Sequence, residues 1–235
     1  MILSKMMAST PRSSYFKTMI TLRTFETTET LMLETLELLR ETFSSPGNLM
    51  LSGGSTPYVI YNRLADVPCP VHPDRKLFLS DERMQPFESK NNNAHNLEPM
   101  LRALECTDRF IRIDTSLPIE QAAAGFESEL QSMKTVDLGF LGMGGDGHTA
   151  GFFTPEHAQQ SKGPLTLHTD RPDGMQGISV TPAFLKHVNK MILLVTGESK
   201  RDVIHTLLNE PQSIPAGIAL SDHPNIELWT DIPIA

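Results

Sequence analysis

Short apolar runs alternate with longer amphipathic stretches along nearly the whole chain. Alternation of this kind, with strands that are apolar on both sides, is typical of a mainly parallel sheet covered by helices on both faces. We therefore expect an α/β fold with three layers, α/β/α, of the modified Rossmann-like class. The expected strands are 19–25, 48–52, 76–80, 110–113, 136–141, 178–181, 190–196 and 226–230, and the expected helices are 28–43, 57–64, 92–104, 118–133 and 198–208.

No linker divides these elements, so we expect a single α/β domain over residues 19–235. Residues 1–18 are rich in serine and basic residues and contain no acidic one, which predicts a flexible N-terminal extension. An upstream start codon and a transit peptide are the alternative interpretations of that stretch. Residues 154–177 are rich in proline, glycine and polar residues, and we expect an irregular segment whose composition permits movement over a ligand.

Composition excludes several classes of protein. The net charge of −8 disfavours a nucleic-acid partner, because phosphate backbones require a basic face. No apolar run approaches the roughly 18 residues that span a bilayer, and the N-terminus lacks the apolar core of a secretory signal. Cys69 and Cys106 form no CxxC, so we expect reduced thiols in a cytoplasmic protein. The sequence leaves a monomer and a small homo-oligomer both open.

Three unusual loops follow expected strands directly: "GGSTP" at 53–57, "DER" at 81–83 and "GGDGH" at 144–148. Ligands of open α/β sheets bind at the carboxyl ends of the strands. The three loops should therefore lie on one edge of the sheet and converge on one crevice.

The first loop has the features of an anion site. Gly53 and Gly54 allow a sharp turn and close approach of a ligand, and Ser55 and Thr56 add hydroxyl donors at the start of a helix. The spacing is neither that of a P-loop nor GxGxxG, so a dinucleotide is not indicated. A plain turn with a Ser/Thr cap is the alternative.

Two further segments supply charge. In the second loop Arg83 is a candidate partner for an anion, with Asp81 or Glu82 orienting it or contacting hydroxyl groups, and a solvated charge cluster is the alternative. Lys200 stands in the first turn of an expected helix, where a cation is unfavourable unless an anion lies nearby. Lys200 is therefore a second candidate phosphate contact, with a surface lysine as the alternative.

The third loop carries the candidate base. Glycines, among them Gly144, leave the main chain bare before His148, and Asp146 stands two residues earlier, where it can hold the imidazole in one tautomer. A histidine ordinarily titrates near neutral pH, which suits a general base. The other histidines lack such a setting, and we expect surface positions for His72, His95, His157, His168, His187, His205 and His223. No HExxH, Cys/His cluster or GxSxG is present, so neither a metal site nor a serine hydrolase is indicated.

These motifs, in this order, resemble the 6-phosphogluconolactonase family, within the wider sugar-phosphate isomerase/deaminase-like group that includes glucosamine-6-phosphate deaminase. The matching segments are "SGGSTP" at 52–57, "SDER" at 80–83, "LGMGGDGHTA" at 141–150, "ISVTPAFL" at 178–185 and "TGESKRDVI" at 196–204. The resemblance runs from about residue 20 to the end.

The resemblance implies that the domain is catalytic and hydrolyses 6-phosphoglucono-δ-lactone in the pentose phosphate pathway, without a metal or organic cofactor. It implies His148 as general base, Asp146 as the group that orients it, and a phosphate cradle made by the first loop. Arg83 and Lys200 would supply the cations, with Asp81 and Gly144 beside the substrate. The expected partner is thus a small phosphorylated sugar lactone.

The chain departs from the family pattern at two places that matter for function. Family members place an arginine, expected to contact phosphate, where this chain has Gly177, and Arg171 in the preceding loop is the candidate substitute. The deaminases carry a glutamate shortly after the DGH motif, where this chain has Phe153, so deamination ranks below lactone hydrolysis. A non-catalytic sugar-phosphate sensor is the third hypothesis, against which the Asp146–His148 pair argues.

Overall fold

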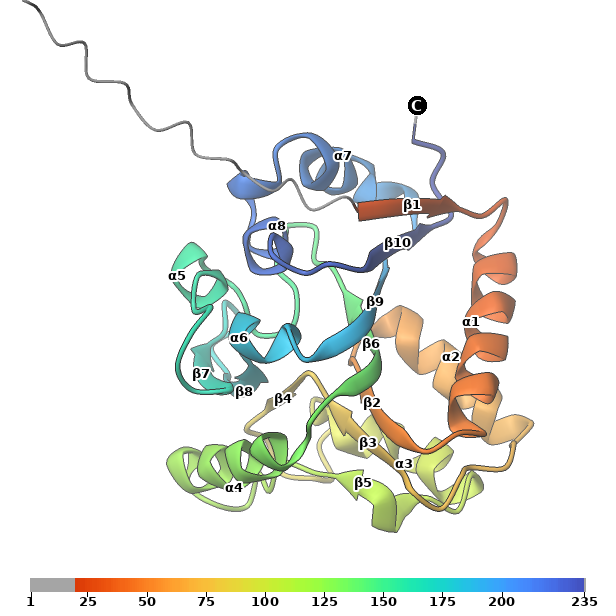
Figure 1. The fold of residues 1–235 in the computed structure, drawn as a ribbon, viewed down its shortest axis with the longest axis vertical. Helices are drawn as coiled ribbons and strands as arrows, with labels where there is room; N and C mark the ends of the chain where they lie inside the picture. The colour runs from red at the N-terminus through yellow and green to blue at the C-terminus, as the bar shows by residue number, and fades with distance from the viewer. Residues whose placement is uncertain (1–19, 235) are drawn as a thin grey trace, which may run out of the picture.

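A seven-stranded parallel sheet forms the centre of the molecule (Figure 1), as a computed structural model that describes residues 20–234 shows. Its strands stand in the order β1, β10, β9, β6, β2, β3 and β5, and every neighbouring pair is parallel. The expected parallel sheet is confirmed. The bounds are β1 (Ile20–Thr24), β2 (Gly47–Leu51), β3 (Arg75–Leu79), β5 (Phe110–Ile111), β6 (Val136–Gly142), β9 (Val188–Leu194) and β10 (Ile226–Thr230).

Helices cover both faces of this sheet, which gives the three layers that the sequence predicts. One face carries α1 (Thr28–Phe43), α2 (Ser55–Asp66) and α3 (Asn93–Ala103), and the other carries α4 (Ile119–Ser132), α6 (Pro182–Leu185), α7 (Arg201–Asn209) and α8 (Pro215–Leu220). The sheet separates two apolar clusters, and successive strand residues enter them in turn: Leu49 and Leu51 join the first, Met50 the second. Strands that are buried on both faces explain the unbroken apolar runs in the sequence.

A second, smaller sheet corrects the expectation of an irregular segment at 154–177. Its antiparallel strands stand in the order β4 (Asp81–Arg83), β8 (Gln176–Val180) and β7 (Thr166–Asp170). A short helix, α5 (Pro155–Ala158), precedes β7 in the chain. From Leu167 to Asp170 the residues of β7 alternate between buried and exposed positions, but prolines and glycines on either side obscure so short a pattern. The "DER" segment, expected as a loop, is thus an edge strand of this sheet.

The remaining differences concern short elements. Helices α6 and α8 and the 3-10 turns η1 (Thr107–Arg109) and η3 (Pro211–Ser213) were not predicted. The helix expected over 198–208 is the 3-10 turn η2 (Glu198–Lys200) followed by α7. Elements of three to six residues contain too few positions for a helical period to stand out. The flexible extension expected over residues 1–18 lies outside the described residues, and the single domain over 19–235 stays a prediction.

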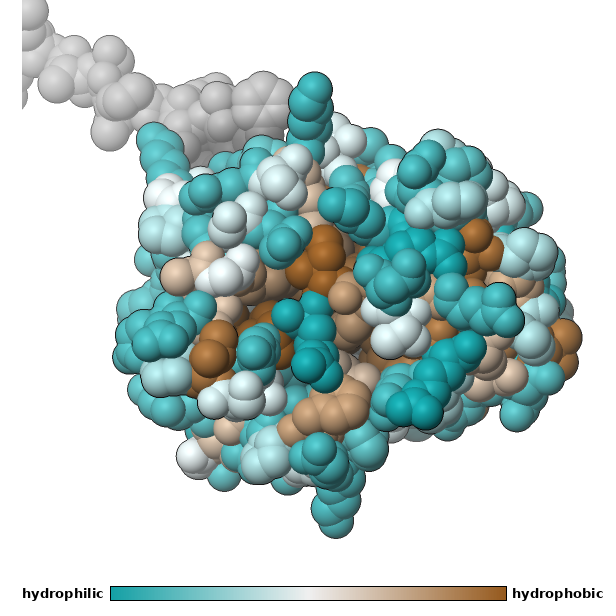
Figure 2. All heavy atoms as spheres, turned by 90° about the horizontal axis from the view of Figure 1, so that it is seen from below, coloured by the Kyte–Doolittle hydropathy of each residue, from teal (hydrophilic) through white to brown (hydrophobic). Residues whose placement is uncertain are grey.

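The surface seen from below is mainly hydrophilic, with hydrophobic residues in scattered areas between hydrophilic ones (Figure 2). The large hydrophobic residues that are exposed come from different elements and are Leu22, Leu33, Val59, Val67 and Leu117. Within residues 20–234, no helix has both the length and the apolar character required to cross a bilayer.

Candidate active site

A cavity of about 220 Å³ opens at the carboxyl ends of the central strands β2, β6 and β9 and beside β4. The three loops singled out in the sequence all contribute to it, so the expected convergence on one crevice is what the structure has. The lining residues are Ser52, Gly53, Gly54, Ser55, Thr56, Pro57, Asp81, Arg83, Asn93, Gly142, Met143, Gly144, His148, Ala150, Arg171, Leu194, Val195, Thr196 and Lys200.

The wall after β2 has the geometry of an anion site. Gly54 stands at the start of α2 with φ +121°, a conformation that L side chains rarely adopt. Within residues 20–234 no side chain caps this helix, so backbone N–H groups of its first turn are free to meet a ligand. Thr56 Oγ1 lies 2.8 Å from the hydroxyl of Thr196, which follows β9. This bond joins the turn after β2 to the segment after β9, although β6 lies between the two strands in the sheet.

The loop after β6 folds tightly around its own histidine. The backbone N–H of Gly144 donates to the carbonyl of His148 at 2.8 Å, and that of Gly147 donates to Gly144 at 3.0 Å. A Cβ atom on Gly144 would lie 2.2 Å from His148 Nδ1 and 2.4 Å from Asp146 Oδ1. Glycine at position 144 is therefore a steric requirement for the paired side chains.

Asp146 and His148 form a hydrogen-bonded pair at the rim of the cavity. His148 Nδ1 lies 2.5 Å from Asp146 Oδ1, and the His148 backbone N–H donates to the same oxygen at 3.2 Å. Partial burial acts to raise the pKa of Asp146, but the hydrogen bonds from the ring and the backbone of His148 outweigh it and lower the pKa. An ionised Asp146 fixes the proton on Nδ1 and leaves Nε2 as the basic nitrogen of the imidazole.

The ring of Phe153 packs on this histidine. The two ring centroids are 4.7 Å apart with planes inclined by 40°. The guanidinium of Arg171 lies on the same phenyl ring, 4.8 Å from its centroid. An apolar ring thus occupies the space beside the imidazole, and position 153 offers no carboxylate to a ligand.

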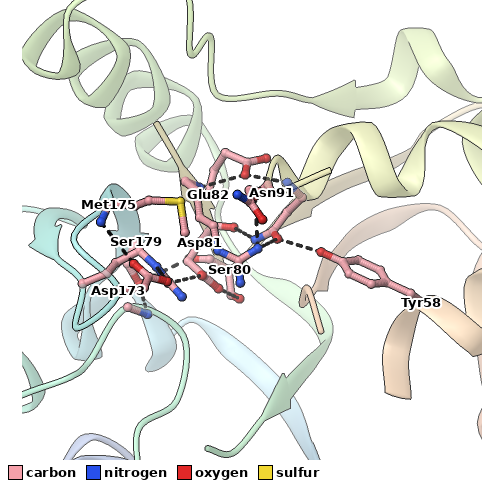
Figure 3. A network of polar contacts seen from close by, with 12 residues as sticks. Tyr58, Ser80, Asp81, Glu82, Asn91, Asp173, Met175 and Ser179 are labelled. Atoms are coloured by element: carbon pink, nitrogen blue, oxygen red, sulfur yellow. Dashed lines mark hydrogen bonds and ion pairs between the residues drawn. The ribbon is translucent and has the colours of Figure 1, made fainter. Parts of the chain in front are cut away.

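The "DER" strand divides its charges between the cavity and the protein interior (Figure 3). Asp81 lines the cavity, and its Oδ1 accepts from the Ser80 hydroxyl at 2.8 Å. Glu82 is 2% exposed and turns away, accepting backbone N–H bonds from Asn93 and Ala94 at 2.7 Å and from Arg83 at 2.8 Å. Burial raises the pKa of Glu82 to about 7, against the lowering effect of these three donors.

This arrangement distinguishes two carboxylates that the sequence treats alike. Asp81 is placed to contact a ligand, whereas Glu82 holds the start of helix α3. The sequence could not separate the two, because adjacent strand residues point to opposite sides and the side facing the cavity depends on the neighbouring strand.

Arg83 lines the cavity, and only part of its guanidinium donors are used by the protein. Its Nη1 donates to the Asn91 carbonyl at 3.1 Å and to Asn93 Oδ1 at 3.2 Å. Its Nε is buried and has no hydrogen-bond partner within the described part of the chain. A buried guanidinium donor that lacks a partner is costly, and an oxyanion in the cavity is the kind of group that satisfies it.

Two more cations line the cavity. Lys200, the last residue of η2, donates from Nζ to the Met143 carbonyl at 2.9 Å, next to the glycine loop. Arg171, with a side chain only 10% exposed, lies 3.2 Å from Asp173 and 4.0 Å from Asp81. A Cβ atom on Gly177 would lie 3.7 Å from Arg171 Cδ, so the two positions are neighbours across the β7–β8 hairpin. The arginine that the sequence suggested as a substitute is therefore at the cavity.

Sequence reasoning missed Asn93 and Thr196, which line the cavity as well. Thr196 stands two residues after the end of β9, so its place near a strand end was available as a signal. The expected surface position of His223 is wrong: this residue is 3% exposed, with Nε2 2.8 Å from the Val188 carbonyl. A contact across 35 residues leaves no local pattern.

Among residues 20–234 no cluster of His, Cys, Asp and Glu is arranged to hold a metal ion.

Comparison with known proteins places this chain in a family. The family model of glucosamine-6-phosphate isomerases and 6-phosphogluconolactonases matches residues 25–228, and the chain belongs to that family. The 6-phosphogluconolactonase of Thermotoga maritima is 34% identical over 171 residues, which are 69% of this chain and 74% of the relative. The glucosamine-6-phosphate deaminase of Staphylococcus haemolyticus is 33% identical over 128 residues, 48% of this chain and 52% of the deaminase.

Solved structures agree with these relatives. The crystal structure of the Thermotoga maritima 6-phosphogluconolactonase superposes with a TM-score of 0.75 at 25% identity, covering 90% of this chain and 99% of that one. The three-layer fold with a mainly parallel sheet is thus the fold of 6-phosphogluconolactonases.

Proposed function

We propose that this protein hydrolyses 6-phosphoglucono-δ-lactone to 6-phosphogluconate, the lactonase step of the pentose phosphate pathway. One observation carries the proposal: His148, which is hydrogen-bonded to Asp146, lines the same cavity as the glycine turn at 53–56 and three cations. A small phosphorylated sugar lactone needs both, a base for its carbonyl end and an anion site for its phosphate.

The phosphate end is assigned to the start of α2. The free N–H groups of its first turn, the hydroxyls of Ser55 and Thr56, and the cations Arg83 and Lys200 form the cradle. Arg171 adds a third cation, next to Gly177, the position at which the family pattern has an arginine. These charges give the cavity a local positive character although the protein carries a net charge of −8.

The carbonyl end is assigned to His148. Its Nε2 takes a proton from water while the water oxygen bonds to the lactone carbonyl carbon and forms a tetrahedral oxyanion. The oxyanion then collapses, the bond from that carbon to the ring oxygen breaks, and the imidazolium returns its proton to the ring oxygen. The products are a carboxylic acid, which ionises, and a free hydroxyl group, and the enzyme ends in its starting state. Asp146 orients the imidazole and stabilises its transient charge.

The related deaminase reaction is the runner-up, because a relative with that name matches about half of the chain. The packing of Phe153 on His148 opposes it, since the position that would supply an acid carries a phenyl ring. The sensor hypothesis retains the same cavity without turnover. The same proposal includes a cytoplasmic location, which the two thiols led us to expect. It also includes a monomeric or small homo-oligomeric state.

A coupled assay with freshly generated lactone tests the function. The wild-type protein should accelerate hydrolysis well above the spontaneous background, and His148→Ala should lose about 10²- to 10⁴-fold of that acceleration. Ammonia release from glucosamine 6-phosphate would instead favour the deaminase. Thermal stabilisation by 6-phosphogluconate without turnover, in wild type and in His148→Ala alike, would favour the sensor.

A further inference from the structure

A buried asparagine, Asn93, connects three walls of the cavity. It is the first residue of α3, and it is 1% exposed although it lines the cavity. Its Oδ1 accepts from the Tyr58 hydroxyl at 2.7 Å and from Arg83 Nη1 at 3.2 Å. Its Nδ2 donates to the Asp81 carbonyl at 2.9 Å. Figure 3 shows Tyr58 reaching from α2 toward the residues of β4.

The same amide packs against the glycine turn. A Cβ atom on Gly53 would lie 2.6 Å from Asn93 Oδ1 and 2.8 Å from Nδ2. Only a residue without a side chain fits there, so the turn that begins the anion site rests directly on the Asn93 amide. Asn93 therefore touches the elements that carry the phosphate cradle and the strand that carries Arg83.

The main chain of Asn93 does not depend on this amide. Its backbone N–H donates to Glu82 Oε1 at 2.7 Å, and the helix is capped by the side chain of Asn92, which accepts from the His95 N–H at 2.9 Å. The start of α3 is thus secured by Glu82 and Asn92. The hydrogen bonds of the Asn93 side chain go instead to groups at the cavity.

The consequence for Arg83 is orientation. A guanidinium is planar, so two acceptors on Nη1, the Asn91 carbonyl and Asn93 Oδ1, limit how the plane can turn. The Nε of Arg83, which has no hydrogen-bond partner among residues 20–234, lies in the same plane, so its direction is limited as well. Holding a donor in its bound geometry before the ligand arrives reduces the entropy lost on binding.

We propose that Asn93 is a positioning residue that, with Tyr58 as its partner, holds the guanidinium of Arg83 ready for the phosphate of the substrate. Asn93 acts through Arg83 and is not itself a catalytic residue. This inference rests on the proposed function, because it assigns Arg83 to the substrate phosphate.

A double-mutant cycle tests the inference. The dissociation constant of 6-phosphogluconate is measured by calorimetry, and KM and kcat for the lactone by the coupled assay, in wild type, Asn93→Ala, Arg83→Ala and the double variant. Asn93→Ala should weaken binding and raise KM about tenfold, the size of a lost hydrogen bond to a charged group, and leave kcat within about threefold. In the Arg83→Ala background the same change should have less than about a twofold effect.

Asn92→Ala is the matched control. Asn92 is equally buried and adjacent, but its side chain bonds to Gln85, Thr115 and the His95 N–H rather than to Arg83. Loss of this cap should lower the melting temperature and leave the dissociation constant of 6-phosphogluconate unchanged. Should Asn93→Ala not fold, Tyr58→Phe takes its place in the cycle. It removes only the hydroxyl that holds Oδ1, and about a threefold effect on binding is expected, again absent without Arg83.

Two outcomes would overturn the inference: unchanged binding in Asn93→Ala or its substitute, or a tenfold loss that persists without Arg83. The binding measurement separates this from failure of the proposed function. A wild-type protein without lactonase activity overturns the reaction, whereas its binding data still report on Asn93.

Discussion

At the scale of single residues, the absence of a side chain is as informative as any functional group. Gly144 faces the imidazole and the carboxylate of the pair at distances that no Cβ atom tolerates. Gly145, its neighbour, has no atom within 4 Å of the same hypothetical Cβ. The two glycines look alike in the sequence, and only their surroundings distinguish them.

Gly144→Ala should therefore reduce kcat/KM by about 100-fold, because displacement of a catalytic group by about 1 Å has an effect of that order. Gly145→Ala is the control and should stay within about threefold of wild type, since open space surrounds that position. Steady-state kinetics with the fresh lactone, alongside melting temperatures, makes the comparison. Equal activity of the two variants would show that the Asp146–His148 geometry is not required.

The buried histidine predicts a dependence of stability on pH. Burial lowers the pKa of His223, while its bond to the Val188 carbonyl acts the other way. As pH falls below the ordinary value of about 6.5, the unfolded chain takes up a proton that the folded protein does not, so stability is lost. The contribution of His223 to the stability of the fold is complete above a pH of about 6.5.

His223→Gln removes the titrating group and keeps a donor for the Val188 carbonyl. The decrease in unfolding free energy between pH 7.5 and pH 5.5 should be smaller in the variant by about 1 kcal/mol. Urea denaturation at the two pH values measures it. The same decrease in both proteins would mean that other groups account for the acid sensitivity.

At the scale of elements, a buried carboxylate joins β4 to α3. Glu82 accepts three backbone N–H bonds, two of them from the first turn of the helix. The first N–H groups of a helix have no intrahelical partner, and a carboxylate there also meets the positive end of the helix dipole. Strand and helix are thereby held as one unit that presents Arg83 and Asn93 to the cavity.

Glu82→Ala should lower the unfolding free energy by about 2–4 kcal/mol, because it leaves buried N–H groups without acceptors. Glu98→Ala, on the same helix, is the control. It removes only an i,i+4 pair with the exposed Arg102, which is worth about 0.5 kcal/mol or less. Chemical denaturation of both variants decides, and losses of similar size would contradict the anchoring role of Glu82.

At the scale of the whole molecule, the cavity joins parts of the chain that are distant in sequence. Its walls are the loops after β2, β6 and β9 and part of the small sheet. A bound ligand would therefore contact segments from the whole length of the domain. A ligand that binds only the folded state stabilises the entire fold. This stabilisation should require the phosphate group of the ligand, since we propose that the cations of the cavity bind that group.

Addition of 6-phosphogluconate at about 100 times its dissociation constant should raise the unfolding free energy by about 2.7 kcal/mol. Gluconate, which lacks the phosphate, should give little change at the same concentration. Thermal unfolding at fixed ionic strength measures both. Equal stabilisation by the two compounds would remove the phosphate from the recognition of the ligand.

The sequence alone determined the parallel sheet, its two helical layers and the edge at which the site lies. These follow from local periodicity and from the rule that loops after parallel strands share one edge, as for "GGSTP" and "GGDGH". The pair of Asp146 and His148 was also predictable, because its members stand only two positions apart in the chain.

Only the tertiary structure decided which carboxylate of "DER" faces the cavity, that Asn93 accepts a hydrogen bond from Arg83, that Arg171 reaches the cavity, and that His223 is buried. Each of these depends on a partner many residues away, and the pairing of β4 with β8 joins positions about a hundred residues apart. Sequence periods report which face of an element is apolar, but they carry no information about which distant residue will cover it.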